Sequence, residues 1–338
     1  MNKLALTFYS VLRMPIADIV ECAKAGEQAG FGYISVAESF YRDGSALAAT
    51  IAANTKSVQI GTSVFPIYTR TPFQLAMAMS TLDEASAGRI GFLGLGIGYR
   101  YRTESYFGID VEHPMARMRE YVEIIRLLIS GKDASYQGKF FHFNGFPKLT
   151  QEGLHIPIYF GSSGPKMITL AGEIADGVIL NSLPTTEHVR QARNALSYGA
   201  IKSGRDPKGL TIASSLIYSV SDNLDEAEYA AKEDVLFYLG YPEINPILDQ
   251  SGLRDVGEAV RKTNREQGKE QAFKLIDKRL LDKVAIYGNE AACRARLKEF
   301  IDSGIDQPII RVSNVPYQEK DKKRVFLRAI KSLNNFEW

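Results

Sequence analysis

Residues 157–177 read PIYFGSSGPKMITLAGEIADG, and this stretch decides the fold. Its apolar start predicts a strand, its Gly/Ser run predicts a turn, and Pro165 opens a helix-forming segment. A strand, a turn and a helix start in this order aim several free backbone N–H groups at one place, which suits a phosphate. The residues of this predicted anion-binding turn are Gly161, Ser162, Ser163, Gly164, Pro165 and Lys166.

Units of the same kind run along the rest of the chain. Short apolar runs, typical of strands buried on both faces, alternate with longer segments of helical period. Strands are predicted at 4–8, 33–37, 58–64, 90–95, 156–160, 177–180, 210–220 and 308–312. Eight strand–helix units predict an α/β fold, a (β/α)8 TIM barrel with insertions. An open doubly wound sheet is the alternative, and it is less favoured because no unit carries a dinucleotide-binding fingerprint.

Two segments break this alternation. Residues near 131–156 predict a hairpin insertion, and residues near 225–285 predict a helical insertion around the seventh unit. Insertions of this kind often cover an active site. No Pro/Ser-rich linker or change of composition divides the chain, so residues 1–338 are expected to form a single barrel domain.

Composition and charge argue against several classes of protein. The 338 residues are 45% hydrophobic, which is enough for a large core and argues against disorder. The net charge of +2 favours neither nucleic acid nor an anionic membrane as a partner. Cys22 and Cys293 are far apart in sequence and are expected to be buried thiols. With no signal peptide and no apolar run of about 20 residues, the protein is expected to be cytoplasmic.

Further candidate site residues follow from the barrel, because active sites of this fold lie at the carboxyl ends of the strands. Those ends combine apolar and aromatic surface with glycines and few ionisable groups, which suits a flat ring with a phosphorylated tail. No nucleophile with an adjacent base, as hydrolysis would need, is found there. Besides the 161–166 turn, the candidates are Glu38, Ser63, Val64, Gly96, Gly98 and Asn181.

The acid at the end of the second strand, Glu38, has two open interpretations. It could bind cofactor or substrate and act as a catalytic acid, or it could cap a helix or pair with Arg42. The alternating glycines at 94–98 let a ligand or a neighbouring backbone come close but lack the spacing of a dinucleotide motif. None of the four histidines lies at metal-ligand spacing from Cys, Asp or Glu, so no metal is predicted.

Several segments, in order along the chain, resemble the bacterial-luciferase-like superfamily of flavin and deazaflavin oxidoreductases. TLDEASAGR at 81–89 is similar to the superfamily's TLDELSGGR stretch, and LGLG follows at 93–96. The other similar segments are VAES at 36–39, the third-strand region at 60–72 and the fifth unit at 157–178. Within the superfamily, the branch that uses the deazaflavin coenzyme F420 is the most similar, and it includes the methylenetetrahydromethanopterin reductases.

This resemblance implies an oxidoreductase that transfers a hydride between F420 and a small organic substrate, with methylenetetrahydromethanopterin-like pterins among the candidates. It also implies that a non-prolyl cis peptide at Ser63-Val64 forms a bulge behind the deazaflavin ring. The turn from Gly161 to Gly164 would hold the phosphate of the cofactor tail, with Lys166 beside it. No covalent intermediate with the protein is needed, and a homodimer is expected.

The chain departs from the family pattern at several strand ends. Glu38 and Ser39 stand where the family has Asp and His, and Thr7 stands where the methylenetetrahydromethanopterin reductases have an acid. The candidate proton donors of those enzymes are therefore missing here, and the substrate stays open. The first alternative is an FMN-dependent monooxygenase of the same fold. The second alternative is a non-catalytic flavin-binding member of the superfamily.

Overall fold

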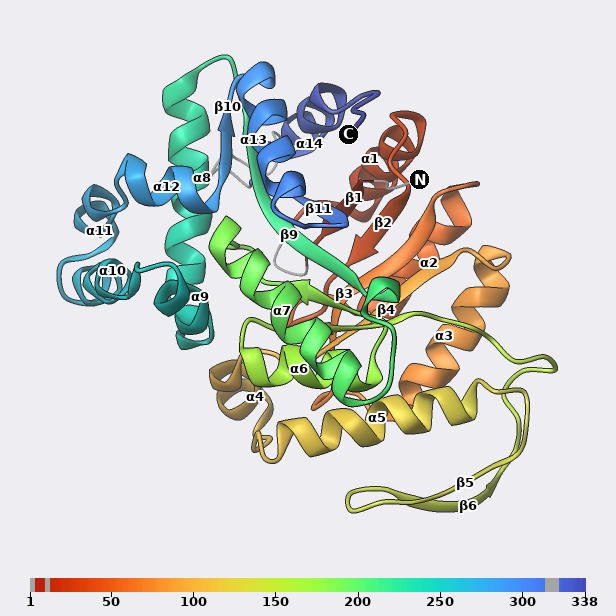
Figure 1. Cartoon of the computed structure of the whole chain (residues 1–338). Coiled ribbons are helices and arrows are strands. Elements are labelled where there is room, and N and C mark those ends of the chain that lie inside the picture. Colours follow the sequence, from red (N-terminus) through yellow and green to blue (C-terminus); the bar gives the residue numbers. More distant parts are fainter. Residues whose placement is uncertain (1–3, 10–12, 314–321) are drawn as a thin grey trace.

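A closed barrel of eight parallel strands lies at the centre of the computed structural model, which describes residues 4–9, 13–313 and 322–338 (Figure 1). The barrel strands are β1 (Ala5–Phe8), β2 (Tyr33–Val36), β3 (Gln59–Pro66), β4 (Ile90–Gly96), β7 (Ile158–Gly161), β8 (Gly177–Leu180), β9 (Thr211–Val220) and β11 (Gln307–Val312). Each pairs with the next in this order, and β11 pairs with β1 to close the ring. The predicted (β/α)8 TIM barrel is confirmed.

Helices surround the barrel, and most of them pack buried apolar residues against it. In the first of them, the buried positions include Ile19, Cys22 and Ala23, which share one face of the helix. Both cysteines are buried and free, as expected. The surrounding helices are α1 (Ile16–Gln28), α2 (Gly44–Asn54), α3 (Pro72–Ser86), α4 (Arg100–Phe107), α5 (Pro114–Leu128), α6 (Pro165–Ile174), α7 (Thr186–Lys202), α13 (Glu290–Asp302) and α14 (Lys322–Ser332). A single 3₁₀ turn, η1 (Pro207–Gly209), leads into β9.

Side chains fill the lower interior of the barrel. The rings of Phe92 and Tyr159 stack there with centroids 5.0 Å apart, and Ile179 and Ile309 belong to the same buried cluster. Gly61 is required at this level, because a Cβ on it would lie 2.4 Å from the Phe92 ring. The barrel is therefore a packed core at this level, with a cavity toward its carboxyl end.

A two-stranded antiparallel sheet lies apart from the barrel, formed by β5 (Ala134–Gln137) and β6 (His142–Phe146) (Figure 1). Glu120 of α5 holds the tip of this hairpin, since its carboxylate accepts backbone N–H groups from Lys139 and Phe141 at 2.7 and 3.1 Å. The hairpin is thus fixed to the helix that precedes it.

A helical segment separates β9 from β10 (Ile286–Gly288) and lies on one side of the barrel (Figure 1). It has an apolar cluster of its own, which reaches the barrel side through Leu183 and Ile217. Its elements are α8 (Leu224–Leu239), the 3₁₀ turn η2 (Pro242–Ile244), α9 (Asn245–Gln250), α10 (Arg254–Gln267), α11 (Lys269–Leu275) and α12 (Lys278–Val284). We call these elements the helical insertion.

Two elements were not expected from the sequence. Helix α4 has the sequence RYRTESYF, which shows no apolar periodicity. Strand β10 has only three residues and extends the far end of β9, where Ile286 pairs with Tyr218 and Gly288 with Val220. Both lie near the carboxyl end of the barrel, and α4 contributes Arg102, Thr103 and Phe107 to the candidate site described next.

Candidate functional site

A cavity of about 580 Å³ lies at the carboxyl end of the barrel. Every barrel strand contributes to it, either through its own residues or through the residue that follows it. One such residue from each strand in turn is Thr7, Ala37, Val64, Gly96, Gly161, Leu180, Ser215 and Arg311. The helical insertion adds Phe237, Tyr238 and Glu243 to the wall. The cavity therefore lies where this fold places its active sites.

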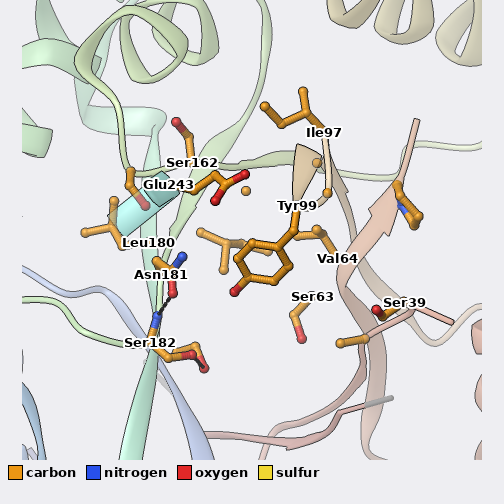
Figure 2. A pocket seen from close by; sticks show the side chains of 18 of the residues that line it. Ser39, Ser63, Val64, Ile97, Tyr99, Ser162, Leu180, Asn181, Ser182 and Glu243 are labelled. Atoms are coloured by element: carbon orange, nitrogen blue, oxygen red, sulfur yellow. Dashed lines mark hydrogen bonds between the residues drawn. The ribbon is translucent and has the colours of Figure 1, made fainter. Parts of the chain in front are cut away.

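All the site residues expected from the sequence line this one cavity. They are Glu38, Ser63, Val64, Gly96, Gly98, Gly161, Ser162, Ser163, Gly164, Pro165, Lys166 and Asn181. The structure thus brings them together, while the role of each in binding or catalysis remains a prediction. Figure 2 shows Ser162, Asn181 and Glu243 on one side of the Tyr99 ring and Ser39 and Ser63 on the other.

The floor of the cavity is shaped by a bulge in β3. The peptide bond between Ser63 and Val64 is cis, and the register between β3 and β4 shifts between Thr62 and Phe65. The Ser63 hydroxyl is held by two others, since its Oγ lies 3.1 Å from Thr7 Oγ1 and 2.9 Å from Ser35 Oγ. The cis bond lies at the position that the family resemblance implied.

Val64 also determines which residue can stand at the ends of β4 and β7. A Cβ added to Gly96 at the end of β4 would lie 2.6 Å from Val64 Cγ2, and one added to Gly161 at the end of β7 would lie 2.8 Å from Val64 Cγ1. Contacts this short are not tolerated between carbon atoms. The two glycines are therefore required by packing, because they let Val64 stand as an apolar wedge in the cavity.

The Gly/Ser turn after β7 is built as its sequence suggests. The Gly164 N–H donates to Ser162 Oγ at 3.2 Å, and the Ser162 N–H donates to the Ile179 carbonyl at 3.1 Å. Helix α6 begins at Pro165, so the N–H groups of Lys166 and Met167 in its first turn have no partner inside the helix. These donors face an anion favourably at the positive end of the helix dipole.

His188 supports this turn from below. The side chain is fully buried, and its Nε2 lies 3.2 Å from the carbonyl oxygen of Ser163. Burial lowers the pKa of His188 to about 4, although the Ser163 contact opposes the shift. The imidazole is therefore neutral near pH 7, and its Nε2–H donates to the turn. The sequence indicated a structural histidine but not this contact, which joins α7 to the turn.

Glu38 lines the cavity, but both of its carboxylate oxygens have partners. Arg70 donates Nε to Oε1 and NH2 to Oε2, each at 2.6 Å, and the Gly44 N–H donates to Oε2 at 2.6 Å. The two side chains are 10% and 14% exposed, so this is a nearly buried bidentate pair. Glu38 pairs with Arg70 and not with Arg42, which donates to the Met14 carbonyl. These contacts hold the carboxylate in one position, and a catalytic role of Glu38 stays a prediction.

A second buried ion pair joins the barrel to the helical insertion. Arg311 of β11 lies 2.6 Å from Asp234 of α8, and the two side chains are 4% and 8% exposed. Burial alone would lower the pKa of the Arg311 guanidinium, but the Asp234 carboxylate raises the pKa above its ordinary value. The guanidinium also stacks on the Tyr9 ring at 4.0 Å. The cavity wall at this point is charged but internally neutralised.

Three residues at the site were missed from the sequence: Arg102, Tyr241 and Glu243. Glu243 accepts the Arg100 N–H at 3.0 Å through Oε1, while its buried Oε2 has no hydrogen-bond partner among the described residues. Burial raises the pKa of the Tyr99 phenol in the middle of the cavity, so this ring is a neutral donor near pH 7. Glu243 reaches the cavity through a contact with Arg100 of α4, 143 residues away in sequence, so the sequence alone could not place it there.

Two further findings concern metal sites and membrane-spanning helices. Within the ranges 4–9, 13–313 and 322–338, no group of three or more His, Cys, Asp or Glu side chains is placed to hold a metal ion. Over the same ranges, no helix has the length and apolar character required to traverse a bilayer.

The closed parallel barrel, with one cavity at the carboxyl ends of its strands, defines a (β/α)8-barrel protein of the enzyme type. The chain belongs to the luciferase-like monooxygenase family, whose model matches residues 5–307.

Its relatives include the 5,10-methylenetetrahydromethanopterin reductases of Methanolobus tindarius and Archaeoglobus fulgidus. The first is 32% identical over 92% of this chain and 95% of its own length, and the second is 33% identical over 85% and 86%. Among solved structures, the coenzyme F420-dependent tetrahydromethanopterin reductase of Methanopyrus kandleri superposes with a TM-score of 0.84 over 99% of this chain and 98% of its own, at 22% identity. An F420-dependent secondary alcohol dehydrogenase in complex with an F420–acetone adduct superposes with a TM-score of 0.77 over 99% and 100%, at 20% identity. The two structural matches support the same fold.

Proposed function

We propose that this protein is an F420-dependent oxidoreductase that transfers a hydride between the deazaflavin and a small organic substrate. The observation that carries the proposal is the arrangement around Val64. An apolar wedge lines the same cavity as the predicted anion-binding turn, 161–166. A flat ring with a phosphorylated tail needs these two features together, because the ring requires an apolar support and the tail requires N–H donors.

The residues present fit this cofactor. Val64 would support the ring from behind, with Gly96 and Gly161 leaving room for that side chain. The turn at 161–166 would hold the phosphate through backbone N–H groups, and nothing lies within 4 Å of a Cβ position on Gly164. When bound, the cofactor supplies the hydride chemistry, while the protein orients the ring and excludes water.

The named relatives support the same proposal. The two reductases above 30% identity cover most of this chain, and the solved neighbours named for F420 share its fold. For the substrate, methylenetetrahydromethanopterin is one candidate. Thr7 at the end of β1 lines the cavity where an acid was expected for that substrate. The substrate is therefore proposed only as a small organic molecule, and the homodimer remains a prediction.

An FMN-dependent monooxygenase is the second candidate, since the family model carries that activity in its description. The same wedge and turn would hold FMN, which also has a flat ring and a phosphate. A non-catalytic flavin-binding protein is the third candidate. The three differ in which cofactor is bound and in whether any substrate is turned over.

The proposal is tested by titrating the purified protein with F420 and, separately, with FMN, and by measuring the fluorescence of each cofactor during the titration. We expect tight binding of F420 and at least tenfold weaker binding of FMN. The reverse order would support the monooxygenase, and binding of neither would contradict both.

A pair of glycine variants tests the site itself. In Gly164→Val, branched carbons enter the open space at the turn, so we expect F420 affinity to fall at least tenfold. Gly209→Val is the matched control, because Gly209 also has open space around it but lies outside the cavity. Equal F420 affinity of the two variants would place the phosphate elsewhere.

A further inference from the structure

Arg102 is a buried cation in the wall of the cavity, and the function proposed above does not use it. It lies on α4 and is 8% exposed. Its NH1 donates to Ser39 Oγ at 3.0 Å, and its NH2 donates to the hydroxyl of Tyr241. The guanidinium therefore spans from the end of β2 to the helical insertion.

Aromatic rings surround this guanidinium. Its Cζ lies 5.0 Å from the ring centroids of Phe40 and Tyr241, 5.1 Å from that of Tyr99 and 5.5 Å from that of Phe237. Each of these rings attracts the cation through the negative face of its π system. The rings fix the plane of the guanidinium, but they do not neutralise its charge.

Arg102 differs from the two buried ion pairs of the wall. Glu38 is paired with Arg70, and Arg311 is paired with Asp234. Arg102 has only neutral hydroxyl partners, and within the described ranges no carboxylate oxygen lies within 4.0 Å of it. Buried charges in proteins are normally paired, because an isolated ion loses its hydration without compensation. The described part of the chain therefore supplies no counter-ion to Arg102.

The position of Arg102 separates it from the turn that would bind the phosphate. Ser39, its partner, lies on the far side of the Tyr99 ring from Ser162 (Figure 2). The wedge residue Val64 lies at the end of β3, which is between β2 and β4 in the barrel. An anion at Arg102 would thus lie apart from a phosphate held at the turn.

We propose that Arg102 binds a carboxylate of the substrate, and that the substrate of this protein is an organic acid. The planar guanidinium presents parallel N–H donors that match the two oxygens of a carboxylate. The surrounding rings accept an apolar or aromatic body attached to that carboxylate. That the bound acid is a substrate rests on the proposed function, while the anion site itself rests on the contacts of Arg102.

Benzoate and its uncharged analogue benzamide are the probes, used with the full chain in isothermal titration calorimetry. We expect benzoate to bind at least tenfold more tightly than benzamide. Arg102→Gln is expected to abolish that preference. Arg100→Gln is the matched control. It also removes a positive charge from α4, but the Arg100 side chain is exposed and does not line the cavity. Equal binding of the two probes to the unmodified protein would overturn the proposal, and so would an unchanged preference in Arg102→Gln.

Two further variants cover the case in which Arg102→Gln does not fold, which circular dichroism would reveal. Arg102→Lys keeps the charge but loses the parallel donors, so we expect the preference for benzoate to shrink but persist. Tyr241→Phe frees an N–H of Arg102 and keeps the ring, so the preference should be retained or increased. A complete loss of preference in Tyr241→Phe, with the fold intact, would mean that Arg102 only ties the insertion to the barrel.

The same titrations are made with and without saturating F420. Benzoate selectivity that depends on Arg102 in a protein that fails to bind F420 would support the anion site and contradict the proposed cofactor. F420 binding without benzoate selectivity would support the proposed function and overturn the assignment of Arg102. Since the carboxylate site lies away from the turn, Lys166→Gln should leave the affinity for benzoate unchanged, and a parallel loss would place benzoate at the turn instead.

Discussion

Val64 determines which residues can stand at the ends of the two strands beside it. Its two methyl groups occupy the space that a Cβ on Gly96 or Gly161 would need. The sequence suggested that the glycines at 94–98 let a ligand or a neighbouring backbone come close, and the structure shows that Gly96 leaves room for a side chain. The ligand site therefore depends on a packing relation among three residues.

This relation predicts a rescue. Gly96→Ala forces its new Cβ against Val64, so we expect the free energy of unfolding to fall by about 1–3 kcal/mol and F420 affinity to fall as the wedge moves. Adding Val64→Ala should restore most of the stability but not the affinity. Urea unfolding and F420 titration of the two single variants and the double variant measure both effects. Additive losses of stability in the double variant would contradict the contact.

His188 predicts a dependence of stability on pH. Its pKa of about 4 in the folded protein is below the ordinary value of 6.5. Between these two values the unfolded chain therefore binds a proton at His188 that the folded protein does not bind. The unfolding free energy should therefore fall as pH drops from 6.5 toward 4, by about 2 kcal/mol at pH 5. Urea unfolding at pH 7 and pH 5 measures this difference.

The control for this prediction is His188→Gln, which keeps an N–H donor for the Ser163 carbonyl but cannot titrate. The variant should lose about 2 kcal/mol less stability than the unmodified protein over the same change of pH. An equal loss in both proteins would assign the pH dependence to other groups.

At the scale of elements, helix α8 is fixed to the barrel by a buried charge pair. Asp234→Asn leaves Arg311 buried without a counter-ion, so we expect a loss of about 3–5 kcal/mol in the free energy of unfolding. Asp249→Asn, which breaks the exposed pair with Arg254 in the same insertion, is the matched control and should lose far less. Denaturant unfolding compares the two. Similar losses would mean that the burial of Arg311 is relieved in solution.

The elements of the barrel could be predicted from the sequence because each strand is a short apolar run buried on both faces. Runs such as 58–64 and 177–180 leave no ambiguity once helices alternate with them. The register shift in β3 could be placed only by resemblance, since nothing in the composition of that strand marks a bulge. Helix α4 could not be predicted, because it is held by tertiary contacts such as that between Arg102 and Ser39 and not by an apolar face.

The same limit applies to the candidate site. Residues such as Val64 and Gly161 could be placed there because a barrel fixes where its strands end. Glu243 and Tyr241 come from the helical insertion, whose direction over the cavity follows from long-range packing and not from a local pattern. The ion pair between Glu38 and Arg70 could not be predicted from the sequence either, since the two residues are 32 positions apart.

On the scale of the whole molecule, the helical insertion both packs on its own cluster and faces the cavity through Phe237, Tyr238 and Glu243. We expect a ligand that bridges the barrel and the insertion to slow tryptic cleavage at the junction of α10 and α11, at Arg265 and Lys269. The reason is that cleavage requires local opening, which the ligand would oppose. Time courses with and without F420, read by mass spectrometry, measure the rate.

The hairpin provides the internal control for this experiment. Lys139 lies at its tip, outside the cavity, and its cleavage should proceed at the same rate in both conditions. Equal rates at Arg265 with and without F420 would show that the insertion does not close over the ligand. A parallel slowing at Lys139 would indicate a change in the protease and not in the protein.

Strand β9 is long enough to pair with β8 at its start, with β11 along its middle and with β10 at its end. The helical insertion therefore leaves the barrel on one strand and returns on its immediate neighbour, where the Ser221 N–H donates to the Gly288 carbonyl at 2.9 Å. A segment whose two ends are already joined in this way can be lengthened, shortened or exchanged with little entropic penalty to the rest of the chain. Evolution, or a protein engineer, can in this way exchange one wall of the cavity while keeping the barrel that carries the rest of it.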